Sequence, residues 1–111
     1  MMFLENLFML FFGHALGDFV LQPEAMGYGK NRNDQIHDKE HSLFPRWYYW
    51  LSAHSLVHAG LVYLITGSLL FGLIELAIHW LTDFMKCEGK ISIHQDQGIH
   101  LGCKVLYALF L

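Results

Sequence analysis

Four apolar segments, separated by polar stretches, run through the chain of 111 residues. They cover about residues 3–21, 47–66, 68–86 and 95–111. Each is roughly 17–20 residues long, close to the minimum helix length for crossing a hydrocarbon core of about 30 Å. The polar stretch 22–46 follows the first segment, whereas only a tight turn at Gly67 and Ser68 separates the second from the third. The pattern predicts an all-α fold: a four-helix antiparallel transmembrane bundle with a long polar loop between helices 1 and 2.

Inside these apolar segments, polar side chains recur at intervals of four residues. Residues four apart lie on the same face of an α-helix, so each predicted helix carries one polar stripe. Every member is His, Asp or Glu, the side chains that ligate borderline metal ions. The stripes are His14/Asp18, His54/His58, Glu75/His79/Asp83 and Asp96/His100.

The antiparallel order of the helices brings the four stripes to one side of the membrane. The ends of helices 1 and 3 lie beside the starts of helices 2 and 4 on that side. At 1.5 Å per residue, all four stripes fall within roughly 15 Å of the same face. A random scatter of polar residues would not share a side and a depth. This convergence favours one common site over separate interhelical hydrogen bonds.

Five glycines within the apolar segments predict close helix packing, because a missing side chain lets backbones approach each other. They are Gly13, Gly17, Gly60, Gly72 and Gly102. Three histidines break the four-residue spacing and are expected to be solvated loop residues: His37, His41 and His94.

The composition agrees with a membrane protein and excludes other classes. Hydrophobic residues make up 54% of the chain and charged ones 15%, a shift away from the usual soluble balance. The length predicts one integral membrane domain over residues 1–111. A net charge of -3 without a run of Lys and Arg argues against nucleic-acid binding. Cys87 and Cys103 form no Cys-x-x-Cys pair, so neither a disulfide framework nor a thiolate zinc site is predicted.

The basic residues orient the predicted bundle. Positive charge gathers in cytoplasmic loops of membrane proteins, and six of the seven basic residues lie on the side that carries the stripes. We therefore expect a multi-pass protein of the inner (cytoplasmic) membrane, with the site on the cytoplasmic side, loop 22–46 cytoplasmic and both termini outside. The six are Lys30, Arg32, Lys39, Arg46, Lys86 and Lys90, and Lys104 in the last helix is the exception.

A divalent metal would stabilise these stripes, since buried carboxylates need a counter-charge and neutral imidazoles need a partner. Nitrogen and oxygen donors fit zinc, manganese or iron, and we expect zinc. The donors exceed one tetrahedral site, so either one ion with outer carboxylates or two bridged ions would fit. A polar network or a proton path is the alternative reading. The predicted ligands are His14, Asp18, His54, His58, His79, Asp83 and His100, while Glu75 is expected to support a ligand or form a buried hydrogen bond.

An open coordination position would make this site a hydrolase. Bound water becomes a hydroxide near neutral pH and attacks esters or phosphoesters. Asp96 is the predicted general base, and Lys86 would hold an anionic group such as a phosphate of a lipid-like substrate. The alternatives are a non-enzymatic accessory membrane protein with a structural centre and a partner-binding cytoplasmic loop, a proton or metal conduit, and a soluble metal-binding bundle.

The expected partners follow from the same features. The lipid bilayer would surround the apolar segments, and four short helices would gain from a second copy that shields their polar interior. A homo-oligomer is therefore a further expectation, whereas nucleic acid is not an expected partner.

The motifs together resemble a family of small membrane proteins of bacteria and their phages, known as a domain of unknown function (DUF3307). The resemblance rests on four blocks in order: Gly-His14-x-x-x-Asp18-Phe-x-Leu-Gln22, His54-x-x-x-His58, His79-x-x-x-Asp83-x-x-Lys86 and Asp96-Gln97-x-x-His100. It implies a four-helix membrane protein in which Gln22, Lys86 and Gln97 join the polar set, and it supplies no activity. A looser similarity to membrane-bound metal-dependent hydrolases does not extend to their motifs residue by residue.

Overall fold

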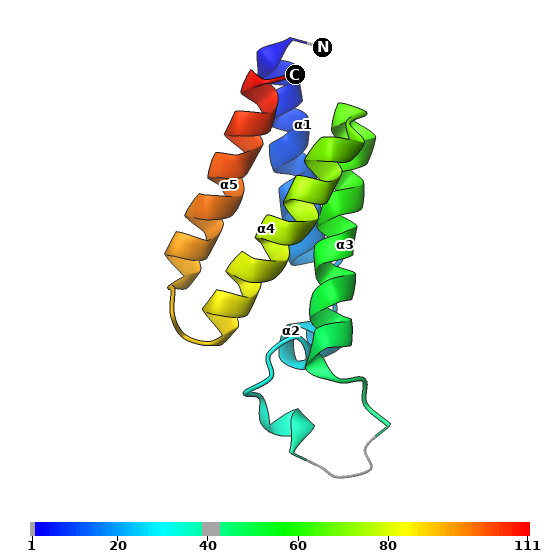
Figure 1. The fold of residues 1–111 in the computed structure, drawn as a ribbon, viewed down its shortest axis with the longest axis vertical. Coiled ribbons are helices and arrows are strands. Elements are labelled where there is room, and N and C mark those ends of the chain that lie inside the picture. The colour runs from blue at the N-terminus through cyan, green and yellow to red at the C-terminus, as the bar shows by residue number, and fades with distance from the viewer. Residues whose placement is uncertain (1, 39–42) are drawn as a thin grey trace.

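Four long helices form the protein in a computed structural model, which describes residues 2–38 and 43–111 (Figure 1). The described residues are helical or irregular, so the predicted all-α class is confirmed. The first helix is α-helical at first and continues as a π-helical turn, η1. The long elements are α1 (Phe3–Ala15) with η1 (Leu16–Val20), α3 (Trp47–Thr66), α4 (Leu69–Cys87) and α5 (Ile93–Leu109). These bounds lie within about two residues of the predicted ones.

Local sequence signals end and begin these helices. Gly67 takes the left-handed conformation (φ 70°) that terminates α3, a conformation that glycine adopts at little cost. The Ser68 hydroxyl then accepts a hydrogen bond from the Phe71 amide at the start of α4. Ser92 and Gln95 form a capping box at the start of α5, which satisfies two otherwise unpaired amides. The tight turns keep α4 antiparallel to both α3 and α5.

The helices are arranged with both termini at one end of the molecule and the long connections at the other (Figure 1). α3 and α4 pack along each other as a hairpin, and α1 packs against α3 and α5. α4 and α5 also contact each other, and near the termini the Phe71 and Tyr107 rings stack with centroids 5.2 Å apart. We call the end that carries residues 21–46 and 88–92 the loop end.

The long connection is more ordered than a simple polar loop. It contains a short helix α2 (Glu24–Gly29) and a 3₁₀ turn η2 (Gln35–His37), and Lys39 and His41 lie outside the described residues. His37 Nε2 lies 2.8 Å from the Gly29 carbonyl oxygen, so the prediction that His37 is a solvated side chain was wrong. His94, in the first turn of α5, is exposed as expected.

Two further contacts fasten this connection to the end of α4. Arg32 donates a hydrogen bond to the Glu88 carboxylate, and Asn33 Nδ2 donates to the Cys87 carbonyl oxygen over 3.3 Å. The hydrogen bond from Arg32 lowers the pKa of the Glu88 carboxyl below its ordinary value. The segment 22–38 is thereby held across the loop end of the bundle.

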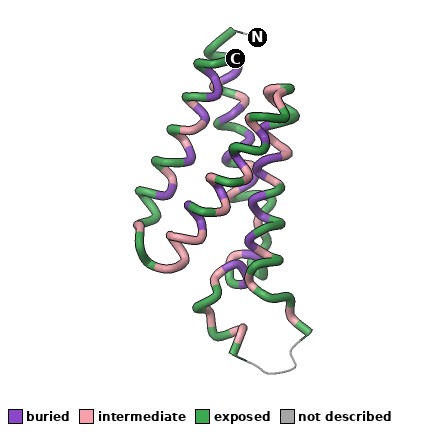
Figure 2. The backbone as a smooth tube through the Cα atoms, viewed as in Figure 1, coloured by how far each residue is buried: buried purple, intermediate pink, exposed green. Residues whose placement is uncertain are grey.

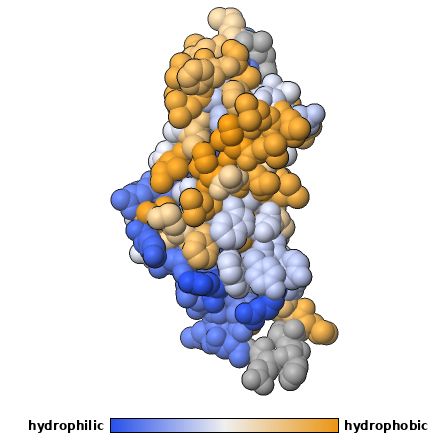
Figure 3. All heavy atoms as spheres, in the orientation of Figure 1, coloured by the Kyte–Doolittle hydropathy of each residue, from blue (hydrophilic) through white to orange (hydrophobic). Residues whose placement is uncertain are grey.

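The interior of the bundle is polar and its outer surface apolar. Buried positions follow the inner faces of the helices (Figure 2), and most of the fully buried large side chains are His, Asp, Glu or Lys. Large apolar side chains such as Phe8, Leu64 and Leu70 are exposed instead. Figure 3 shows that hydrophobic residues cover the part nearer the termini, whereas hydrophilic residues gather at the loop end.

Only part of the predicted membrane topology passes a direct test. Among the described residues, Phe3–Val20 is the one helical stretch with both the length and the mean hydropathy of a membrane span. The polar stripes lower the mean hydropathy of α3 and α4, and α5 has 17 residues. Four spans therefore stay a prediction.

The glycine prediction is confirmed at three positions and wrong at two. A Cβ at Gly13 or Gly17 would lie within 3 Å of a side chain on α3, and one at Gly72 within 3.2 Å of the Ala59 carbonyl oxygen. Gly60 and Gly102 face open space among the described residues. Glycine therefore permits close packing between the first helix and α3 and between α3 and α4, but not at every glycine position.

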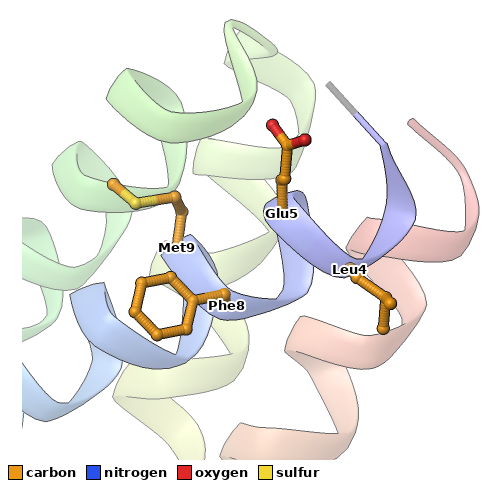
Figure 4. Close-up of a pocket in the computed structure, with 4 residues that line it drawn as sticks. All are labelled: Leu4, Glu5, Phe8 and Met9. Atoms are coloured by element: carbon orange, nitrogen blue, oxygen red, sulfur yellow. The ribbon is translucent and has the colours of Figure 1, made fainter.

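A shallow hollow of about 370 Å³ lies against the first turns of α1, lined by Leu4, Glu5, Phe8 and Met9 (Figure 4). Glu5 is one of its four lining residues and the only charged one. Its lining residues lie roughly 8–15 Å along the helix from His14, at 1.5 Å per residue. It is thus separate from the polar stripes.

Candidate metal centre

The π-helical turn at the end of the first helix places Asp18 inside the bundle. Such turns insert one extra residue into a helix and often occur at functional sites. Asp18 Oδ1 lies 2.8 Å from His58 Nε2, 3.1 Å from His54 Nε2 and 3.7 Å from His79 Nε2. One carboxylate oxygen therefore faces three imidazole nitrogens from α3 and α4.

The distances among these four donors are near those of a tetrahedral metal site, for which zinc gives the reference values. Ligands about 2.0–2.1 Å from zinc at the corners of a tetrahedron lie about 3.3–3.4 Å apart. His54 Nε2 and His79 Nε2 are 3.3 Å apart, and the three distances to Asp18 Oδ1 lie on both sides of that value. All four ligand atoms lie within 4.8 Å of one another. The donor set therefore fits one ion without a rearrangement of the helices.

The burial of the donors favours a cation at their centre. His54, His58 and His79 are at most 1% exposed, and the Asp18 side chain is 10% exposed. Two Nε2 atoms at 3.3 Å can share at most one proton, and a buried carboxylate needs a counter-charge. His54 Nδ1 has no hydrogen-bond partner among the described residues, so nothing there fixes the ring through its other nitrogen.

Glu75 lies behind His79 on the same helix. Its Oε2 is 3.0 Å from His79 Nδ1, it accepts a 2.7 Å hydrogen bond from Lys104 Nζ, and its Oε1 accepts one from the Tyr107 hydroxyl over 3.1 Å. Glu75, His79 and His100 also lie close enough together to be considered as a metal site. The Lys104 ammonium already supplies a cation to this carboxylate.

His14 and His100, two predicted ligands, lie beside the four donors but have other partners. His14 Nε2 is 2.8 Å from Gln97 Oε1, and His100 Nε2 is 3.1 Å from Asp96 Oδ1. Gln97 Nε2 donates to Asp18 Oδ2 over 2.8 Å, which joins α5 to the centre. The His100 ring stacks on His79 with centroids 4.0 Å apart. In this arrangement both histidines support the donor set from outside.

Asp83, also predicted as a ligand, is held between two lysines. Its Oδ2 accepts a 2.7 Å hydrogen bond from Lys30 and lies 3.5 Å from His54 Nε2. Lys86 Nζ lies 3.0 Å from Asp83 Oδ1 and 3.9 Å from Asp96 Oδ2. The predicted catalytic pair, Asp96 and Lys86, therefore lies one residue away from the donors: Lys86 reaches them through Asp83, and Asp96 through Gln97.

Sequence reasoning missed three residues that complete this polar interior. Lys104 and Tyr107 follow His100 at intervals of four and three residues, so the stripe on α5 could have been extended to them. Lys30 gives no such signal, because it lies in the polar connection, yet it is 5% exposed and also donates to Gln22 Oε1.

A substitution at Gly17 tests whether the position of the His58 ring matters for metal binding. A Cβ there would lie 2.6 Å from His58 Cε1 and 2.7 Å from its Nε2, so Gly17→Ala should displace the His58 ring. Overpacking of this kind costs about 1–3 kcal/mol, and zinc affinity should fall with it. Thermal unfolding and zinc titration of Gly17→Ala beside Gly102→Ala, where space is open, measure both effects. Unchanged zinc affinity in Gly17→Ala would show that His58 is not a ligand.

The chain belongs to a family described as proteins of unknown function (DUF3307), whose family model matches residues 6–110. The resemblance drawn from the four sequence blocks is confirmed to that extent, and a bacterial or phage origin and the likeness to hydrolases stay predictions. No curated protein and no solved structure matched the chain.

Proposed function

We propose that the protein is an integral membrane metal-binding protein. The reversed polarity of the bundle supports its membrane location: His, Asp, Glu and Lys side chains fill the interior while Phe and Leu face outward. A soluble bundle would expose this apolar surface to water at a large cost. In a bilayer the same surface is solvated by lipid, and interior charges are paired.

The proposed orientation places the loop end in the cytoplasm. Lys30, Arg32, Arg46, Lys86 and Lys90 lie at this end or in its connections, and both termini lie at the other (Figure 1). This distribution agrees with the positive-inside rule. The metal centre would then lie near the cytoplasmic boundary of the inner membrane.

The single observation that carries metal binding is the set of four donors from three helix segments. Asp18 Oδ1 and the Nε2 atoms of His54, His58 and His79 converge at 2.8–3.7 Å. Nitrogen and oxygen donors at tetrahedral spacing favour zinc. We propose one ion, because the second group of donors contains Glu75, which already pairs with Lys104.

Detergent-purified protein tests both parts of this proposal. We expect the chain to stay in the membrane fraction after an alkaline carbonate wash, because its apolar surface is solvated by lipid. Elemental analysis should then find about one equivalent of zinc per chain, because the four donors surround one point. Release of the chain by carbonate would refute the membrane location, and metal-free folded protein would refute the metal centre.

As the activity at this centre we propose hydrolysis of a phosphate-containing or lipid-like substrate. The observation that favours it is a chain of contacts that leads from Lys86 to the donors. Lys86 is partly exposed, its ammonium lies near both Asp83 and Asp96, and Gln97 donates hydrogen bonds to Asp96 and to the donor Asp18. When bound, the metal would supply an activated water. Asp96 would take up a proton from it, and Lys86 would hold the anionic group.

Asp96→Asn separates this activity from metal binding. Asn keeps the shape of the side chain but cannot act as a base, so hydrolysis of a phosphoester substrate should fall by roughly a hundredfold or more. Zinc content should stay unchanged, because Asp96 is not among the four donors. Equal activity of wild type and Asp96→Asn would contradict the assigned role.

A structural centre in a non-enzymatic membrane protein is the second candidate. It is favoured by the presence of four protein donors, since structural zinc sites are closed by four protein ligands and catalytic ones keep a position for water. Cobalt substitution distinguishes the two. An absorption spectrum that shifts when azide is added indicates an exchangeable position, and an unchanged tetrahedral spectrum indicates a closed centre.

A conduit through the membrane is disfavoured by the layer above Glu75. Leu10, Val62 and Ala108 are buried there with Tyr107, and Leu7, Ile65 and Phe71 pack against them. The polar column from the loop end therefore meets an apolar layer before it reaches the termini.

A further inference from the structure

We propose that Glu75, held by Lys104 and Tyr107, is the positioning residue that orients His79 toward the metal. This inference rests on the proposed metal centre and assigns a role to a buried network that the donor set itself does not require. Glu75 and Lys104 are each 1% exposed, so the pair is removed from solvent. An ion pair in such a place needs additional hydrogen bonds to be stable.

The contacts of Glu75 are arranged around one imidazole. His79 and Glu75 lie four residues apart on α4, and His79 Nδ1 is 3.0 Å from Glu75 Oε2. A carboxylate at this distance requires that Nδ1 carries the proton, because two lone pairs would repel each other. Nε2 then has a free lone pair, and it is Nε2 that faces Asp18 and His54. The carboxylate thus selects the tautomer that can ligate.

Metal-binding histidines commonly donate their second nitrogen to a carboxylate, which fixes the ring and raises its basicity. His79 has such a partner, whereas His54 Nδ1 has none among the described residues. The ring of His79 also stacks between His58 and His100, with centroids 3.7 Å and 4.0 Å away. The His79 ring is therefore held more firmly than the His54 ring, because its Nδ1 has a partner and the Nδ1 of His54 has none among the described residues.

Lys104 and Tyr107 in turn fix Glu75. The Lys104 ammonium and the Tyr107 hydroxyl bind different oxygens of the carboxylate. Both come from α5, which contributes no donor to the proposed centre. The network therefore links α5 to the metal through α4. It also gives a role to Lys104, a buried lysine in an apolar segment: its ammonium neutralises Glu75 at Oε2, the oxygen that also faces His79 Nδ1.

The test compares wild type with Glu75→Gln and with Glu75→Gln/Lys104→Met. The single variant leaves the Lys104 ammonium buried and unpaired, which can prevent folding. The double variant removes both charges, so its interior stays neutral and it is expected to fold. We expect zinc affinity to fall by about 10–100-fold in both variants, the usual effect of losing such a partner. A double variant that folds and binds zinc as tightly as wild type would overturn the inference.

A second readout does not depend on the metal. Nitrogen NMR of ¹⁵N-histidine-labelled, metal-free protein, with His79→Gln to assign the signal, reports which ring nitrogen of His79 is protonated. We expect Nδ1–H in wild type and loss of that preference in the double variant. If wild type binds no zinc but shows Nδ1–H, the metal proposal fails and the orienting role of Glu75 stands. If zinc binds and Nδ1 is unprotonated, the orienting role fails alone.

Discussion

His79→Ala is expected to remove nearly all bound zinc from the purified protein. Structural zinc sites supply about 10–16 kcal/mol through four ligands, so one ligand accounts for about 3 kcal/mol, more than a hundredfold in affinity. His79 is one of the four donors, and its Nε2 lies 3.3 Å from His54 Nε2 and 3.7 Å from Asp18 Oδ1. Isothermal titration with zinc after chelator treatment measures the loss.

His94→Ala is the matched control for this variant. His94 lies in the first turn of α5 and is exposed, so its removal takes away an imidazole without touching the centre. Its zinc affinity should equal that of wild type. The melting temperatures of both variants with chelator report whether folding is affected. A His79→Ala protein that retains wild-type affinity would exclude His79 as a ligand.

Lys30→Met is expected to lower the free energy of unfolding by about 3 kcal/mol, the lower end of the cost of breaking a buried ion pair. Lys30 and Asp83 are both buried, and their charged groups are 2.7 Å apart. The variant leaves the Asp83 carboxylate in the interior with Lys86 as its remaining cation. Denaturant unfolding in detergent gives the difference in free energy.

Arg32→Met is the control, because it removes the other cation that binds the connection to α4. The Arg32 side chain is 49% exposed where it pairs with Glu88, and exposed ion pairs contribute about 0–1 kcal/mol. High salt should weaken this contact further, while the Lys30 pair should hardly respond. Equal losses in the two variants would show that burial does not decide the strength of the Lys30–Asp83 pair.

The helices and their stripes could be predicted because both depend on local periodicity. Apolar runs of fixed length predicted α3 and α4 to within a residue or so, and four-residue spacing placed the polar side chains on inner faces. Lys30 could not be found in this way. It reaches Asp83 across 53 positions of the chain, a contact that depends on how the connection folds back.

The seven predicted ligands do not form a single group. Four of them converge, and His100 lies in a second group with His79 and Glu75. The reason is geometrical: four residues advance about 400° around a helix, so each step along a stripe turns the side chain by about 40°. A stripe therefore spirals, and its members cannot all point at one atom. At Asp18 the extra residue of the π-helical turn changes the direction of the side chain. A pattern based on α-helical spacing cannot predict this change.

The α3–α4 hairpin carries three of the four proposed donors, and this bears on the order in which the helices assemble. These two helices are adjacent in sequence, joined by a tight turn, and together carry His54, His58 and His79. Neighbouring helices with a short connection associate at little loss of chain entropy. We expect the hairpin to capture the ion first with three nitrogens. The first helix would then dock last, guided by the attraction between the Asp18 carboxylate and a cation already in place.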